Sequence, residues 1–581
     1  MPGGLLNLVA YGNQNVILNG NPSKTFFKTT YAKYTNFGLQ KFRIDFSGQR
    51  TLRLTESSVF DFTVPRYGDL LMDTYLVVNL PNIWSPVYPP TNALPHGGPP
   101  PTTHNETWQP YRFEWIKNLG TQMIERVRFT IGGQVIQDFT GQYLLNLVNR
   151  DFSAEKLQLY KEMTTVQTPW EVPYENNESL YGDAFFAGKD LSGSSASANE
   201  SKYNQVGSEP TIRAKQIYIP LNIWFTLAAK MALPLVSLQY AELKIEVTLR
   251  PIQELFTIKR VYTGTETIED NSRDRIQPNF NESQYGLYRF LQSPPDVNIN
   301  DDSVYVNRQS NWNADVHLLS TYGFLTDDEV RIFAGNEQRY IVRQAFTTRF
   351  HDVVGSRRID VNSIGMVSNY MWFFQRSDVD ERNEWSNYTN WPYGYAPQAP
   401  VSAEDQKIVT PWDGGTAPNA NSLPPAGNKT SGFYNPANQK LIMTTWALSL
   451  DGKYRENEFP AGVFDYVEKY VRTSGNGPEG LYCYNFALHS DPFDFQPSGA
   501  INMSKFTNVQ FEVVTNLPVL DSQAQFNAIC GVNPTSGESE VIGVSKPAFG
   551  IYKYTYDLVV MEERWNVVVF SNGMASLQFS R

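Results

Sequence analysis

Residues 243–249 read Leu-Lys-Ile-Glu-Val-Thr-Leu, with an apolar side chain at every second position. This period of two predicts a β-strand with one buried face and one polar face. The pattern returns 266 residues later, the offset from Leu243 to Val509. The matching pairs are Tyr218 with Tyr484, Tyr240 with Phe506, Leu243 with Val509, Ile245 with Phe511, Glu246 with Glu512 and Val247 with Val513. A repeat this long indicates two similar β-sandwich units rather than a solenoid.

Further strand patterns lie on both sides of this stretch, at residues 51–55, 58–65, 74–80, 126–131, 338–350, 358–361 and 565–570. The 39 Gly and 36 Pro residues are spread over many short turn clusters, which is typical of an all-β chain. Short helices are expected at 151–163, capped by Asp151 or Ser153, at 326–335, opened by a capping box, and at 463–471.

Changes in composition divide the chain into four parts. Residues 1–25 form an N-terminal arm with Gly-rich ends, and 26–255 carry the first set of strands. Residues 256–315 have weak periodicity and many Asn, Asp and Arg residues, so a linker is predicted there. Residues 316–581 carry the second set of strands.

The net charge of −11 argues against binding nucleic acid directly, because such binding needs a basic face. Residues 1–53 are an exception, with seven basic residues against Asp45 alone. This basic segment suits an anionic layer such as lipid head groups, and an ordinary solvated arm explains it equally well. Only 18% of residues are charged and 14% are aromatic. This composition fits either a protein that buries much of its surface against neighbours or one with large β-sandwich cores.

The search for catalytic and metal-binding motifs finds no site. The two cysteines, Cys483 and Cys530, imply no disulfide framework and fit a reducing compartment. Cys483 and His489, with Asp491 and Asp494 nearby, match no zinc spacing. No enzyme activity, cofactor or metal is therefore predicted. No apolar run reaches the ~18 residues of a membrane span, and no secretory signal is recognised, so a soluble protein is expected.

Seven N-x-[ST] sequons occur, about the number that chance would produce in this composition. An unmodified chain is the favoured interpretation. Asn105 and Asn428 are the better candidates for glycosylation because each lies beside a loop rich in Pro and Gly.

The first forty residues carry Gly3-Gly4-Leu5-Leu6, the turn Gly20-Asn21-Pro22, and Thr25-Phe26-Phe27-Lys28. Because of these motifs, the sequence resembles the start of the major capsid proteins of nucleocytoplasmic large DNA viruses, particularly the giant, Mimivirus-like members. The resemblance continues at residues 251–255, 288–295, 312–315, 375–379, 382–392, 462–476 and 480–486. It implies two tandem eight-stranded jelly rolls with long inserted loops, at 26–255 and 316–581.

The family also implies a function. Three chains would form a pseudo-hexagonal homotrimeric capsomer, and these capsomers would tile the icosahedral shell of a virion assembled in the host cytoplasm. The loops 84–107 and 391–432 would face outward. The arm would lie on the inner side, against minor capsid proteins or an internal membrane.

An alternative from another class is a carbohydrate-binding or carbohydrate-active β-sandwich, such as a fibre or adhesin. Its basis is the aromatic content, with 33 Tyr and 12 Trp residues available for stacking on sugars. A large β-sandwich core uses aromatic residues as well.

Overall fold

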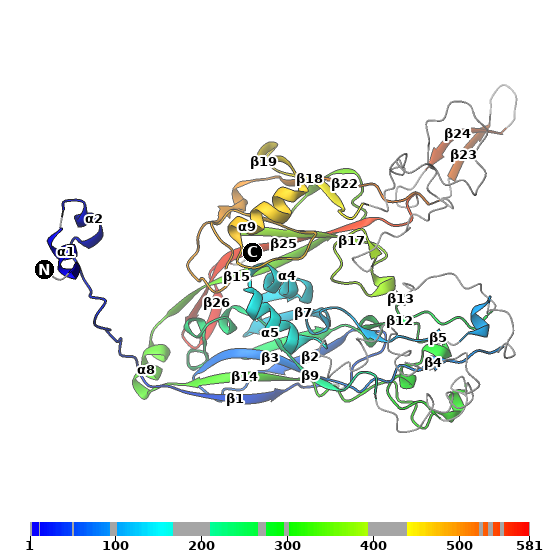
Figure 1. The fold of residues 1–581 in the computed structure, drawn as a ribbon, viewed down its shortest axis with the longest axis horizontal. Coiled ribbons are helices and arrows are strands. Elements are labelled where there is room, and N and C mark those ends of the chain that lie inside the picture. The colour runs from blue at the N-terminus through cyan, green and yellow to red at the C-terminus, as the bar shows by residue number, and fades with distance from the viewer. Residues whose placement is uncertain are drawn as a thin grey trace.

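The computed structural model of the chain describes residues 3–10, 12–48, 51–92, 102–107, 109–166, 210–264, 275–295, 301–392, 439–521, 527–532, 539–545 and 551–579. Two β-sandwiches follow one another along the chain, and an N-terminal arm projects from one end of the body (Figure 1).

The first sandwich is built from two antiparallel sheets. One has the order β1–β14–β3, with β9 and β10 both paired to β3, and the other has the order β2–β11–β7–β8. Their bounds are β1 Gly38–Asp45, β2 Ser58–Thr63, β3 Leu70–Leu80, β7 Ile124–Ile131, β8 Gln134–Thr140, β9 Lys215–Pro220, β10 Leu233–Pro234, β11 Leu243–Leu249 and β14 His317–Phe324. Gly132 and Gly133 form the predicted hairpin turn between β7 and β8, with φ of 57° and 84°.

The second sandwich repeats this arrangement. Its sheets have the orders β15–β25–β17–β20, with β21 and β26 at the sides, and β16–β22–β18–β19. Their bounds are β15 Gln338–Phe350, β16 Ser356–Asp360, β17 Met366–Arg376, β18 Met443–Leu450, β19 Lys453–Pro460, β20 Leu481–Asn485, β21 Ile501–Asn502, β22 Val509–Thr515, β25 Tyr556–Ser571 and β26 Met574–Leu577.

The two sandwiches have the same topology. In each, the first, third, sixth and eighth long strands form one sheet and the other four form the second, which is the jelly-roll connection. Strand β11 therefore occupies the place of β22, and β9 that of β20. These are the strands that the 266-residue repeat pairs, so the predicted double jelly roll is the observed fold.

The boundary between the jelly rolls differs from the one expected at residue 316. Strand β14 pairs with β1 from Gly38 to Asp45 and with β3 on its other side, so it is the last strand of the first jelly roll. Without β14, the backbone N–H and C=O groups along the facing edges of β1 and β3 would have no hydrogen-bond partners in the sheet. Leaving such groups unpaired costs folding free energy. A strand pattern shows that a strand forms and does not show which sheet it joins.

The predicted linker also forms part of the first jelly roll. Strand β12 (Phe256–Lys259) pairs with β6 (Glu114–Trp115) and β13 (Arg275–Ile276). Phe256 and Phe290 are buried in the first core. This segment therefore folds onto the sandwich and does not bridge two separate bodies. The arm, conversely, is longer than residues 1–25, because β1 begins only at Gly38.

Among the described residues the helices are few and short, as expected. They are α1 Leu6–Val9, α2 Asn15–Asn19, α3 Leu119–Gln122, α4 Gly141–Asp151, α5 Ala154–Thr164, α8 Asp327–Gly335, the π-helical turn η13 Val463–Val467, and α9 Glu468–Arg472. Ser153 caps α5 by accepting a hydrogen bond from the Lys156 amide. The capping box predicted for α8 is wrong, because the Thr326 side chain makes no cap hydrogen bond and Glu329 binds Thr35 of the arm.

Two hydrophobic cores hold the molecule together. The second core fills the second jelly roll, where the rings of Trp372 and Trp446 stack at 4.5 Å between facing sheets. The first core extends beyond its own sandwich and includes Met371 and Met561 from the second. The jelly rolls therefore share apolar packing.

Short strands gather at the end of the molecule opposite to the arm (Figure 1). They are β4 Val87–Tyr88, β5 Gln109–Pro110, β12, β13, β23 Asn527–Val532 and β24 Ser539–Ser545. The insertions that carry these short strands thus lie at one end of the molecule, and the arm leaves from the other.

Candidate interaction surfaces and the charge cluster between the jelly rolls

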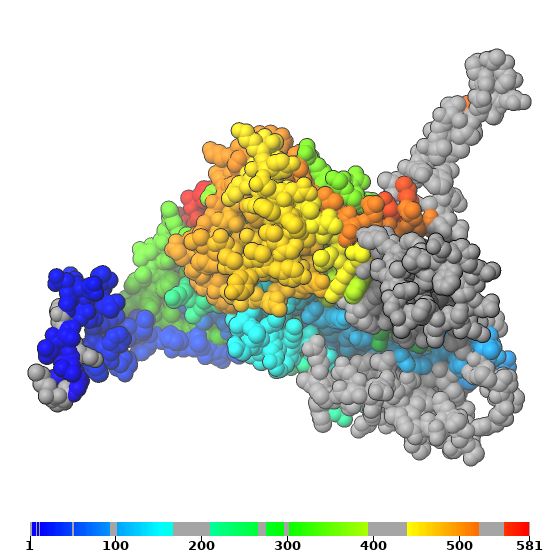
Figure 2. All heavy atoms as spheres, turned by 45° about the horizontal axis from the view of Figure 1, so that its top comes forward, coloured from blue at the N-terminus to red at the C-terminus, as the bar shows by residue number. Residues whose placement is uncertain are grey.

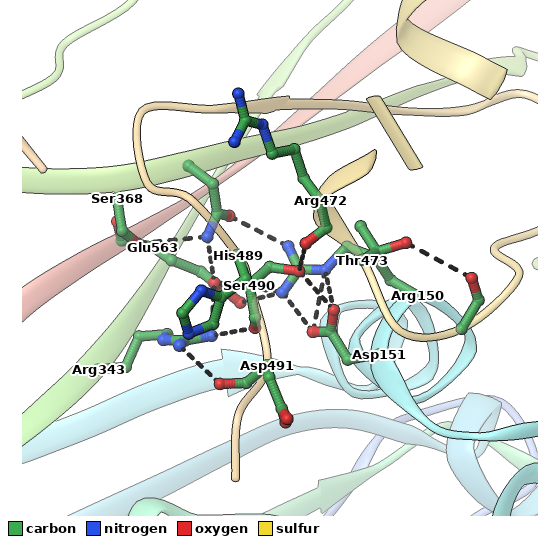
Figure 3. Close-up of polar contacts among 12 residues, drawn as sticks. Arg150, Asp151, Arg343, Ser368, Arg472, Thr473, His489, Ser490, Asp491 and Glu563 are labelled. Atoms are coloured by element: carbon green, nitrogen blue, oxygen red, sulfur yellow. Dashed lines mark hydrogen bonds and ion pairs between the residues drawn. The ribbon is translucent and has the colours of Figure 1, made fainter. Parts of the chain in front are cut away.

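A cluster of charged side chains lies where α4 of the first jelly roll meets the second (Figure 3). Arg150 Nη2 is 2.6 Å from Asp151 Oδ2 and 3.2 Å from Glu563 Oε1 on β25. All three side chains are 0% exposed. Arg150 Nη1 also donates a hydrogen bond to Asn369 Oδ1 on β17 at 3.1 Å. One arginine therefore joins its own helix to two strands of the other jelly roll.

The remaining oxygens of the two carboxylates are also satisfied. Glu563 accepts hydrogen bonds from Asn369 at 2.7 Å and Tyr143 at 2.8 Å, and Arg343 Nη1 lies 3.2 Å from its Oε2. Ser490 donates to Asp151 at 2.6 Å. Two arginines thus balance two carboxylates, which is the condition under which charges tolerate burial.

The local environment acts differently on the two carboxylates. Burial by itself raises the pKa of Glu563, but Arg150 and Arg343, with the two hydrogen-bond donors, outweigh burial and lower this pKa to about 2. For Asp151, burial outweighs the attraction of Arg150 and the pKa is raised above its usual value. Glu563 is therefore the firmly ionised member of the cluster.

A second contact ties the loop after β17 to the segment after β11. Trp385 lies against the Arg250 guanidinium, 4.1 Å from its ring centroid, and its indole N–H donates to the Glu254 carbonyl at 3.1 Å. Asn383 donates to the carbonyls of Gln253 and Phe256, each at 2.8 Å. Two of the segments that carry the family resemblance, 251–255 and 382–392, thus meet in space.

The N-terminal arm stands clear of the body (Figure 2). Its apolar side chains are largely exposed, with Ile17 at 87% and Phe27 at 99%. Thr35 donates a hydrogen bond to Glu329 of α8 at 2.6 Å, at the base of the arm. Within the described part of the chain, no helix has the length and apolar character needed to cross a bilayer.

The residues considered for chemistry have different environments. Cys483 is buried in β20, where burial raises the pKa of its thiol to about 12, whereas His489 is exposed and binds Asp494 at 2.7 Å. The described residues contain no group of three or more His, Cys, Asp or Glu side chains placed to hold a metal ion.

Of the two candidate glycosylation sites, only Asn105 is among the described residues. Asn105 is half-buried, and its side-chain oxygen accepts a hydrogen bond from Thr103 at 2.6 Å. Asn428 and most of the loop 391–432 lie outside the described residues. Both asparagines stay candidates for glycosylation, and an unmodified chain stays the favoured interpretation.

Comparison with known proteins matches both halves of the chain. The family "Major capsid protein N-terminus" matches residues 25–279, and "Large eukaryotic DNA virus major capsid protein" matches residues 329–576. The major capsid protein of Phaeocystis pouchetii virus is 27% identical, over 88% of this chain and 93% of its own. That of Paramecium bursaria Chlorella virus 1 is 24% identical, over 100% of both chains.

Solved structures agree with these matches. The chain superimposes on the capsid protein of PBCV-1 virus with a TM-score of 0.55 at 19% identity, covering 96% of this chain and 100% of the other. It superimposes on the Faustovirus major capsid protein with a TM-score of 0.56 at 12% identity, covering 98% and 96%. These relatives are structural capsid proteins, which favours the capsid hypothesis over a carbohydrate-binding sandwich. The chain belongs to the major capsid protein family of large eukaryotic DNA viruses.

Proposed function

We propose that three copies of this major capsid protein form a pseudo-hexagonal capsomer that tiles the icosahedral shell of a large double-stranded DNA virus. The observation that carries the proposal is the duplication itself. Two jelly rolls of identical strand order lie in one chain, fixed to each other by the buried cluster around Arg150 and Glu563. Three chains around a threefold axis then supply six similar lobes.

The two ends of the molecule suit two sides of a shell. We assign the end with β4, β5, β12 and β13, together with the loops 84–107 and 391–432, to the outer surface. The arm at the other end faces inward, where minor capsid proteins or an internal membrane would meet it (Figure 1). Assembly in the host cytoplasm fits the absence of a disulfide framework in the sequence. The role is structural, without catalysis, cofactor or direct binding to nucleic acid.

The mass of the purified protein in solution tests the capsomer. Light scattering after gel filtration is expected to give about three times the chain mass of 66.1 kDa at micromolar concentration. Interfaces of obligate oligomers bury on the order of 2,000–5,000 Å², so the trimer should survive dilution during the run. A mass of one chain at that concentration would refute the proposal.

Deletion of residues 2–20 is expected to leave soluble trimers that assemble poorly into shells. The arm contains Leu8 and Ile17, which find no burial on their own chain, so they need a partner in the assembled particle. Electron microscopy of the particles that the truncated protein forms measures the yield and shape of the shells. Shells of normal yield and shape would show that the arm is dispensable.

A second arm variant separates two kinds of partner. Replacing Lys24, Lys28 and Lys33 with Gln removes charges worth about 1 kcal/mol each against an anionic lipid surface, and less in high salt. If the partner is anionic, this variant assembles poorly as well. If the arm folds back on its own trimer, the variant assembles normally and only the deletion has an effect.

A further inference from the structure

The helix that follows the fifth long strand of each jelly roll has a different environment in the two halves. In the first half this helix is α4, and almost every residue in it is buried because the second jelly roll covers it. In the second half the helix is η13 with α9; Phe464 is buried in the second core, but four other apolar or aromatic side chains of this helix face solvent. Tyr466 is 60% exposed, Val467 54%, Tyr470 91% and Val471 58%. This segment lies on the surface in Figure 2, within the yellow part of the chain.

The contacts of α4 show what such a helix does. Tyr143 donates to Glu563, the Asn146 amide lies 3.8 Å from the Met561 sulfur, and Arg150 donates to Asn369. Met561 and Glu563 are on β25 and Asn369 is on β17, and Met561 belongs to the core shared with the first jelly roll. Helix α4 therefore packs on the outer face of the β15–β25–β17–β20 sheet.

Two exposed residues of the second helix occupy positions that make these contacts in α4. Tyr143, Asn146 and Arg150 are the third, sixth and tenth residues after β8 ends at Thr140. The third, sixth and tenth residues after β19 ends at Pro460 are Val463, Tyr466 and Tyr470. Tyr466 and Tyr470 are exposed, whereas Val463 is half-buried against the second core. Two of the three positions that bind the neighbouring jelly roll in the first half thus carry solvent-facing aromatic side chains in the second.

The first jelly roll offers a sheet of the corresponding kind. Leu76 and Leu318 point into its core, so Tyr75 and Leu319, both half-buried, lie on the outer face by strand alternation, with the fully buried Val77 beneath them. Leu319 pairs with Tyr75 across β14 and β3, and Val77 pairs with Tyr218 on β9. A half-buried aromatic and aliphatic strip therefore lies on β14, β3 and β9, bordered on β1 by Arg43, which pairs opposite Leu319.

We propose that η13–α9 of one chain docks on this strip in the next chain of the capsomer. The inference rests on the proposed function, in which six similar lobes form a ring. In such a ring the contact between the first and second jelly roll within a chain recurs between the second jelly roll and the first of the neighbour. This apolar contact differs from the charged contact around Arg150. Helix α4 therefore fits the β15–β25–β17–β20 sheet, and η13–α9 fits the β1–β14–β3–β9 sheet, but neither helix fits the other sheet.

The substitution Tyr470→Asp tests the docking. It places a charge in the apolar contact, and the trimer is expected to dissociate, with the mass falling from about three times 66.1 kDa to one chain. The matched control is Tyr240→Asp, since Tyr240 is also largely exposed, at 79%, and lies outside the helix and the strip. This control is expected to stay trimeric. A Tyr470→Asp protein that remains trimeric would overturn the inference while leaving the trimer itself established.

Hydroxyl-radical footprinting of the unmodified trimer gives an answer that needs no variant. Tyr470 is expected to be protected in the trimer although it is 91% exposed in the single chain, whereas Tyr240 should react readily. Equal reactivity of the two tyrosines would contradict the docking, whatever the variant does. A monomeric unmodified protein would instead count against the proposed function.

Discussion

Glu563→Gln is expected to lower the free energy of unfolding by about 3–5 kcal/mol, the cost of removing one partner from a buried ion pair. The substitution keeps the size of the side chain but leaves Arg150 and Arg343 with Asp151 as the only carboxylate of the cluster. Denaturant unfolding measures the effect, at one fixed protein concentration because assembly adds to apparent stability. A loss below about 1 kcal/mol would show that the cluster does not hold the jelly rolls together.

Glu56→Gln is the matched control for this experiment. Glu56 pairs with Arg53 at 2.6 Å, but the two side chains are 71% and 48% exposed. Exposed pairs contribute about 0–1 kcal/mol, so this variant should unfold nearly as the unmodified protein does.

In acid, the stability of the unmodified protein and the stability of Glu563→Gln should depend on pH in different ways. The folded chain holds the pKa of Glu563 at about 2, below its ordinary value of 4.5. The stability that this ionisation contributes is therefore complete above pH 4.5 and is lost as the pH falls toward 2. Glu563→Gln lacks this contribution. The difference in unfolding free energy between the unmodified protein and Glu563→Gln should therefore become smaller as the pH falls from 4.5 toward 2.

Trp446→Ala is expected to cost about 3–5 kcal/mol of unfolding free energy, because a large side chain is removed from a packed core. Trp446 is fully buried and stacks on Trp372 from the opposite sheet, with 23° between the rings. The substitution leaves a cavity between the two sheets of the second jelly roll. Tyr240→Ala, at an exposed aromatic residue, should stay within about 0.5 kcal/mol. Similar values for both variants would mean that the stacked pair does not support this sandwich.

Most of the predicted strands form, because their two faces meet different environments, whereas the alternating stretch 51–55 forms no strand. Residues 243–249 alternate in burial as they alternate in sequence, and the predicted range 338–350 is the observed β15. Strand β14 was not predicted at all, because residues 317–324 are mostly buried on both faces and do not alternate. The segment 256–315 was misinterpreted for a related reason: scattered apolar residues such as Phe290 reach the core from irregular backbone, which has no period.

Helix α4 was not predicted, although its sequence alternates apolar and polar residues with a helical period; its polar residues, such as Asn146 and Arg150, are buried and do not face solvent. The charge cluster was missed with it. Asp151 was interpreted as a helix cap, and Arg150 and Glu563 lie 413 residues apart. A signal for the cluster exists in β25, where Glu562, Glu563 and Arg564 interrupt an otherwise apolar strand. Consecutive charges in a buried strand indicate partners elsewhere in the fold.

A cryo-EM reconstruction of the purified assembly tests the double jelly-roll capsomer most directly. The expected map has threefold symmetry and six lobes, two from each chain, with β4 and β5 on one side of the ring and the arms on the other. It should also show η13–α9 against the β1–β14–β3–β9 sheet of the adjacent chain. A map of isolated single chains, or of a ring without two similar lobes per chain, would contradict the account.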